Sequence, residues 1–271
     1  MEPLIPGLVA LPAHNPGPMT GPGNQTYLFT GRVPTLIDAG VGAPAHLAAV
    51  AAALEAGGWE LSQVIVTHAH TDHASGAAAL AERWPRAVFR KVPWPVADVR
   101  FRVGWAPVRD GDEIEAGDTT LIAVHTPGHA PDHLCLWHPA TRTLLGGDLL
   151  VEGETVVIPG TRGGDLAAYL RSLEAVAALA PRRVLPAHGP PIDDPVALIR
   201  RYSAHRAARE RSVLRAVRDG RDTVGAIADQ VYAGLAGHLR PAAEETVQAH
   251  LNKLVAEGRV QQAGRRYSTQ E

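Results

Sequence analysis

Short apolar runs bounded by turn-forming residues dominate the first two thirds of the chain and predict strands. These runs cover 27–29, 35–40, 63–67, 88–89, 113–114, 120–124, 134–137, 143–145 and 183–185, after an irregular lead-in strand at 1–13. Three longer segments repeat apolar residues at helical spacing, at 44–57, 75–83 and 166–179. This order fits an α+β fold, two packed sheets flanked by helices, better than a strictly alternating parallel sheet.

From Pro195 the pattern changes to helices. A helix of about two dozen residues is predicted to reach Asp219-Gly220, and shorter helices follow at 223–231 and 241–256. Two strands around Gly264 end the chain. Three helices and a basic hairpin are the plan of a winged helix, so we expect two domains, 1–195 and 196–271. The apolar residues that form the small core of the second domain are Val224, Ile227, Val231, Val247, Leu251 and Leu254.

Charge is divided unevenly between the two predicted domains. Residues 1–195 carry 13 basic and 20 acidic side chains, whereas residues 196–271 carry 13 and 8. The basic tail predicts either a groove for nucleic-acid phosphates, or a solvated helix face that supports the acidic domain or a homodimer contact. Its arginines are Arg200, Arg201, Arg206, Arg209, Arg211, Arg215, Arg218, Arg265 and Arg266.

Composition narrows the class of protein further. The 271 residues are 45% hydrophobic and 20% charged, which favours a packed core over disorder. The single cysteine, Cys135, lies in an apolar run and is expected to be a buried thiol without a disulfide. No apolar run approaches membrane-spanning length, so we expect a cytoplasmic protein with no membrane partner.

A dense metal-binding motif follows the apolar run at 64–66. His68, His70, Asp72 and His73 lie within six residues, on the loop that must follow a buried strand. Imidazole nitrogens and carboxylate oxygens are the ligands that suit Zn²⁺ and related divalent cations. In an extended turn His68 and His70 can point to one side, which leaves Asp72 and His73 for a second position. The motif therefore predicts a metal site.

Three further candidate ligands stand where other short strands end. His129 follows Thr126-Pro127-Gly128, Asp148 follows Gly146-Gly147, and His188 follows Pro186-Ala187. Glycines at these junctions allow the backbone to turn sharply. With the first motif they give five histidines and two aspartates, enough for two metal ions and a bridging carboxylate.

Together these motifs resemble the metallo-β-lactamase superfamily. The resemblance implies an αββα sandwich in which His68, His70 and His129 hold one metal ion, and Asp72, His73 and His188 hold a second. Asp148 would bridge the two. Asn-Pro-Gly-Pro-Met-Thr at 15–20, Asn-Gln-Thr-Tyr at 24–27, Thr-Pro-Gly-His-Ala-Pro-Asp-His at 126–133 and the winged-helix tail are similar to the lactamase-beta-like protein 2 group.

Some members of that group cut single-stranded RNA, so the resemblance implies a metal-dependent endoribonuclease. Two cations about 3.5–4 Å apart would generate a bridging hydroxide at neutral pH. The alternative substrate is a small acyl compound, a thioester or lactone, and a third possibility is a non-catalytic nucleic-acid-binding protein. Zn²⁺ suits the histidine-rich set, although Mn²⁺ or Fe²⁺ can occupy similar geometry.

Several residues near the motifs have expected roles. Asp72 is expected to be catalytic as well as a ligand, because it can orient the nucleophile or pass a proton to the leaving group. His133 is expected to orient a ligand, and Arg162 is either an anion-binding or a solvated loop residue. The histidines without a partner motif are expected at the surface: His14, His46, His138, His205, His238 and His250.

Overall fold

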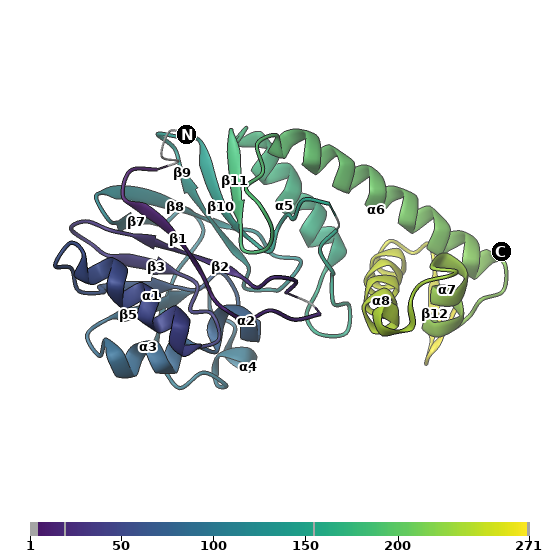
Figure 1. The fold of residues 1–271 in the computed structure, drawn as a ribbon. Helices are drawn as coiled ribbons and strands as arrows, with labels where there is room; N and C mark the ends of the chain where they lie inside the picture. The colour runs from purple at the N-terminus through teal and green to yellow at the C-terminus, as the bar shows by residue number, and fades with distance from the viewer. Residues whose placement is uncertain (1–4, 19, 154, 270–271) are drawn as a thin grey trace.

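Two mixed sheets face each other in the computed structural model, which describes residues 5–18, 20–153 and 155–269 (Figure 1). The first four residues of the predicted lead-in strand, and Met19 in the loop after it, lie outside the described residues. The first sheet has the order β1-β2-β3-β4-β5-β6 and is parallel from β3 onward. Its strands are β1 (Leu8–Pro12), β2 (Gln25–Phe29), β3 (Thr35–Ile37), β4 (Gln63–Ile65), β5 (Val88–Lys91) and β6 (Trp105–Pro107).

The second sheet has the order β11-β10-β9-β8-β7 and is antiparallel except for the β10–β11 pair. Its strands are β7 (Glu113–Ala116), β8 (Thr119–His125), β9 (Leu134–His138), β10 (Thr143–Gly147) and β11 (Arg183–Pro186). Between the sheets, alternate side chains such as Phe29, Ile65 and Leu136 form one apolar layer. Burying one face of each sheet in this way is what the period-two pattern of the strands requires.

Helices cover the two outer faces. The first sheet carries α1 (Pro44–Glu55), α2 (Thr71–Ala74), α3 (Ala77–Arg83) and α4 (Pro95–Asp98). The second carries α5 (Leu166–Ala178) and the first half of α6 (Pro195–Arg218). The four layers confirm the predicted αββα sandwich. The single-turn helices α2 and α4 were not predicted, because one helical turn shows no repeat, and the strand β6 was not predicted, because its short run ends in Pro107.

The long helix α6 extends away from the sheets, and the remaining elements gather at its far end (Figure 1). They are α7 (Val224–Val231), the 3₁₀ turn η1 (Gly237–Leu239), α8 (Arg240–Ala256), β12 (Gln261–Ala263) and β13 (Arg266–Ser268). Ile227, Val247, Leu251 and Leu254 are buried in one apolar cluster, as predicted. The predicted boundary between residues 195 and 196 falls inside α6 and stays a prediction, since this helix packs on both parts.

No helix in the part of the chain that the structure describes has the length and apolar composition to cross a membrane.

Candidate metal centre

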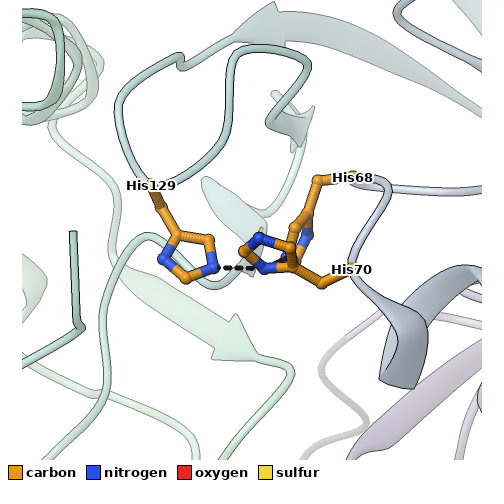
Figure 2. A group of neighbouring side chains, drawn as sticks. All are labelled: His68, His70 and His129. Atoms are coloured by element: carbon orange, nitrogen blue, oxygen red, sulfur yellow. Dashed lines mark hydrogen bonds between the residues drawn. The ribbon is translucent and has the colours of Figure 1, made fainter. Parts of the chain in front are cut away.

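His68, His70 and His129 converge from two different sheets (Figure 2). His68 and His70 lie on the loop after β4, and His129 lies on the loop after β8. His68 Nε2 lies 2.9 Å from His70 Nδ1, and His129 Nε2 lies 2.8 Å from that same nitrogen. Gly128 has a φ of +141°, and a Cβ there would lie 2.4 Å from Tyr169 Cα in α5. Only glycine lets this loop come so close to α5.

Asp72, His73 and His188 form a second group beside the first. Asp72 and His73 belong to α2, and His188 follows β11. Asp72 Oδ2 lies 3.4 Å from His73 Nε2 and 3.3 Å from His188 Nε2. His73 is completely buried, whereas Asp72 and His188 are partly exposed. This group therefore has one side open to solvent.

Asp148 lies between the two groups. Its Oδ1 atom is 3.3 Å from His73 Nε2 and 3.4 Å from His188 Nε2, while Oδ2 is 3.5 Å from His129 Nε2. Among the described residues, Oδ1 is buried without a hydrogen-bond partner. The structure thus brings all seven predicted residues together. Their assignment as ligands stays a prediction.

The ionisation of the first group fits a divalent cation. Burial lowers the pKa of His70 to about 3 and lowers the pKa values of His68 and His129, so their imidazoles are neutral. Burial alone would raise the pKa of Asp148, but His73 and His188 hold it well below its usual range. Neutral imidazoles that face one another are donors that a cation can satisfy. In the second group burial is outweighed by the carboxylates of Asp148, Asp38 and Asp72, which raise the pKa of His73 well above its usual value. Hydrogen bonds to Asp148 and Asp72 likewise raise the pKa of His188 to about 9, so a cation bound by this group must displace protons.

Asp38, which lies within the strand predicted at 35–40 and directly follows β3, orients His73. Its Oδ2 atom lies 2.8 Å from His73 Nδ1, and its Oδ1 atom accepts the Thr67 amide at 2.7 Å. Asp38 has a φ of +65°, a conformation that non-glycine residues rarely adopt. A carboxylate held there keeps the Nδ1 proton on His73, which leaves Nε2 free to bind a metal ion.

Three other groups orient candidate ligands. Asn24 donates from Nδ2 to Asp72 Oδ2 at 3.0 Å, and His133 Nε2 accepts the Asp148 amide at 2.9 Å. The Val157 carbonyl lies 2.7 Å from His129 Nδ1. His133 is therefore an orienting residue, as predicted. The sequence indicates Asn24 only through the Asn-Gln-Thr-Tyr motif at 24–27. No sequence pattern indicates that the backbone carbonyl of Val157 orients a ligand.

Three of the histidines predicted at the surface are instead buried. His46 is within 2.8 Å of the Thr26 hydroxyl, and His138 is within 2.7 Å of the Thr119 hydroxyl. His250, on α8, is buried beside Arg206 and Arg209 of α6. Each contacts a segment distant in sequence, so no local motif indicates its burial. His14 and His238 are exposed, as predicted, and His205 is half-buried.

A cavity of about 640 Å³ opens onto both groups of candidate ligands. Its floor includes His70, His129, Asp72, Asp148 and His188. Its apolar wall is formed by Trp94, Val96, Ala97, Val157 and Pro159. Arg100 and Arg162 also line it, and both are exposed. The cavity therefore combines an apolar surface with two cationic side chains beside the candidate metal centre.

Comparison with known proteins agrees with this geometry. The family model described as the metallo-beta-lactamase superfamily matches residues 18–188. The chain belongs to this superfamily. It is a family of metal-dependent hydrolases, and its members bind divalent metal ions. A second model, the beta-lactamase associated winged helix domain, matches residues 223–268, which confirms the predicted winged helix.

Superfamily relatives extend the similarity over nearly the whole chain. A beta-lactamase-like protein 2 homolog from Caenorhabditis elegans is 31% identical, over 96% of this chain and 88% of that protein. An atrochrysone carboxyl ACP thioesterase from Aspergillus chevalieri is 32% identical, over 80% of this chain and 68% of that protein. A solved metallo-beta-lactamase family protein from Thermus thermophilus has a TM-score of 0.81 and 25% identity, over 99% and 100% of the two chains.

Proposed function

We propose that this superfamily hydrolase uses two divalent cations to cleave a carboxylic thioester or ester. The observation that carries this proposal is the apolar wall beside the candidate metal centre, formed by Trp94, Val96, Ala97, Val157 and Pro159. An acyl chain can bury its surface there, while Arg100 can contact an anionic group on the carrier, and so can the exposed part of Arg162, whose Nε pairs with Glu245. The thioesterase relative supports the same substrate class.

His68, His70 and His129 would hold the first cation, and Asp72, His73 and His188 would hold the second. The two oxygens of Asp148 face different groups, which supports a bridging role. When bound, two cations polarise the scissile carbonyl and make hydroxide available at neutral pH. Zn²⁺ suits the histidine-rich donor set, and Mn²⁺ or Fe²⁺ are the alternatives.

The side chains of the cavity supply the remaining parts of the reaction. Trp94 and Val157 would exclude water from the acyl chain and hold its carbonyl over the candidate ligands. Asp72 lines the cavity, and its carboxylate is fixed by the Asn24 amide. It is therefore placed to receive a proton from the nucleophile and to return it to the leaving thiolate or alkoxide.

The charges of the C-terminal part give less support to the RNA substrate expected from the resemblance. Many of its cations form ion pairs with nearby carboxylates: Arg201–Glu152, Arg240–Asp229, Lys253–Glu210, Arg259–Glu210 and Arg266–Asp222. Paired cations offer less attraction for phosphates. Single-stranded RNA stays the second candidate, because other arginines of α6 are exposed: Arg200, Arg211, Arg215 and Arg218.

One experiment separates the two substrates. Protein loaded with Zn²⁺, Mn²⁺ or Fe²⁺ would be offered a panel of acyl thioesters, with free thiol as the readout, and in parallel a fluorescent single-stranded RNA. Asp148→Ala, prepared identically, is the control. Metal-dependent thiol release by the wild type alone supports the acyl proposal. RNA cleavage without thiol release would refute it in favour of the second candidate.

A further inference from the structure

Helix α8 of the winged helix holds the loop at one rim of the cavity. Glu245 accepts from the Thr161 amide at 2.9 Å and from the Thr161 hydroxyl at 2.5 Å. The same carboxylate lies 3.5 Å from Arg162 Nε. Glu245 is largely buried, with its side chain 17% exposed, whereas Arg162 is 71% exposed. One carboxylate of α8 therefore fixes two consecutive residues of the cavity rim.

The backbones of this loop and of α8 are also in direct contact. Asn252 donates from Nδ2 to the Gly160 carbonyl at 2.9 Å, and the Gly160 amide donates to the Glu245 carbonyl at 3.4 Å. A Cβ on Gly160 would lie 2.4 Å from the Ala249 amide nitrogen. No side chain fits in that space, so the loop and the helix form a close, specific contact rather than a loose approach.

Helix α6 anchors the same loop nearer the candidate metal centre. Arg206, which is 2% exposed, donates from Nη2 to the Val156 carbonyl. Its guanidinium also lies 5.6 Å from the centre of the Tyr169 ring. Tyr169 in turn donates to the Leu149 carbonyl at 2.7 Å, next to Asp148. A buried guanidinium is costly unless its donors are used, and here Nη2 is directed at the backbone of the loop, while Nε has no hydrogen-bond partner among the described residues.

The residue after Val156 connects this anchor to a candidate ligand. The Val157 carbonyl accepts the Nδ1 proton of His129 at 2.7 Å, so His129 Nε2 keeps its lone pair toward the other histidines. Segment 156–163 thus has two functions. It orients His129 at one end, and at the other it presents Arg162 to the cavity.

We propose that the C-terminal part of this chain is a working component of the hydrolytic site. Arg206 is a positioning residue for His129, acting through the backbone of Val156 and Val157. Glu245 is a positioning residue for Arg162, acting through the loop at 160–162. The C-terminal part of this protein therefore supports the loop that lines the cavity and orients His129, through Arg206 of α6 and through Glu245 and Asn252 of α8.

The experiment uses the full chain and two readouts that need no substrate. Affinities for each of two Zn²⁺ ions would be measured by competition with a chromophoric chelator for wild type, Arg206→Met and Arg206→Lys. Arg211→Met, an exposed arginine on the same helix, is the control. We expect a loss of roughly 10- to 100-fold for one of the two ions in Arg206→Met, with partial recovery in Arg206→Lys.

The second readout is the rate of trypsin cleavage after Arg162. Releasing the loop should accelerate cleavage in Glu245→Ala and Asn252→Ala, but not in Glu244→Ala, whose exposed carboxylate pairs with Arg240 on the same helix. Asn252→Ala removes two exposed hydrogen bonds, one to the Gly160 carbonyl and one from Gln248, and it keeps this test open if Glu245→Ala fails to fold.

The inference rests on the proposed metal site. A wild type that binds no metal ion would therefore refute the proposed function itself. Wild-type affinities in a folded Arg206 variant would overturn the role assigned to Arg206. Cleavage after Arg162 at wild-type rate in both α8 variants would overturn the role assigned to Glu245.

Discussion

Replacing Asp38 with asparagine exchanges one carboxylate oxygen for an NH₂ group at a position that is 3% exposed. The carboxylate faces three donors: the Thr67 amide at 2.7 Å, the Thr67 hydroxyl at 3.1 Å and His73 Nδ1 at 2.8 Å. Asparagine has a single acceptor oxygen, so its NH₂ group must face at least one of these donors. If the oxygen keeps the Thr67 amide, the NH₂ group faces His73 Nδ1.

His73 can avoid two opposed donors only by moving its proton to Nε2. That nitrogen faces Asp72 and Asp148, and a protonated nitrogen cannot bind a metal ion. We expect the affinity of the Asp72–His73–His188 group for its cation to fall roughly 10- to 100-fold, equivalent to about 1.4–2.8 kcal/mol. The unfolding free energy of the metal-free protein should fall by about 1–3 kcal/mol, because a buried donor loses its acceptor.

Competition with a chromophoric chelator measures both affinities of Asp38→Asn, and denaturant unfolding of the metal-free protein gives the second quantity. Asp118→Asn is the matched control, since its carboxylate is 68% exposed and pairs only with Arg32 within the described part of the chain. The first cation, at His68, His70 and His129, should bind nearly as in the wild type. Two cations bound with wild-type affinities in Asp38→Asn would refute this account of His73.

Four further outcomes are expected. Asp72→Ala should reduce turnover far more than it reduces the affinity for the first cation. Equal losses of turnover, measured by kinetics, and of affinity, measured by chelator titration, would refute its dual role. Gly128→Ala should cost roughly 2–4 kcal/mol in denaturant unfolding, because its Cβ would meet Tyr169, and Gly111→Ala, whose Cβ meets nothing within 4 Å, should cost less. Removing bound metal with a chelator should lower the midpoint of thermal unfolding, since a metal ion at a thousandfold excess over its Kd adds about 4 kcal/mol to the unfolding free energy. An unchanged midpoint would contradict a resident cation. Burial beside Arg206, Arg209, Lys253 and His205 lowers the pKa of His250 to about 3, so the unfolded chain binds a proton that the fold excludes. The unfolding free energy should therefore decrease as the pH falls below 6.5, by about 1.4 kcal/mol per unit for this group, and His250→Leu should flatten that slope when unfolding is measured at pH 7.5 and 5.

Much of the candidate site could be predicted because its residues occupy one kind of local position. His129, Asp148 and His188 each follow a short apolar strand, and strands of a packed sandwich end at common edges. The layer order could be predicted for a similar reason, since periodicity is strong in segments as long as α5 and α6. What the sequence predicts well is therefore what a single strand or helix determines alone.

The unpredicted features depend on contacts between distant segments. Asp38 meets His73 from 35 positions away, and His46 meets Thr26 from 20. The Val157 carbonyl that orients His129 belongs to the backbone, which looks the same for every residue type. Histidines such as His250 look like surface residues in the sequence because only the packing of α6 on α8 removes them from water.

Charge illustrates the same difference at the scale of whole domains. Residues 196–271 carry an excess of basic groups, and residues 1–195 carry an excess of acidic groups. This division by itself predicts contact with an external anionic partner as well as it predicts contact between the two parts of the chain. In the folded chain Arg201 pairs with Glu152 of the N-terminal part at 3.0 Å, and Arg206 binds the Val156 carbonyl. Exposed pairs of this kind add little stability, but complementary charge selects one orientation of two surfaces. The contacts between the two parts use little of this asymmetry, since the pair Arg162–Glu245 has the opposite sense of charge and the other ion pairs of the C-terminal part lie within residues 196–271. What these contacts favour is one placement of α6 and α8 beside the loop at 156–163.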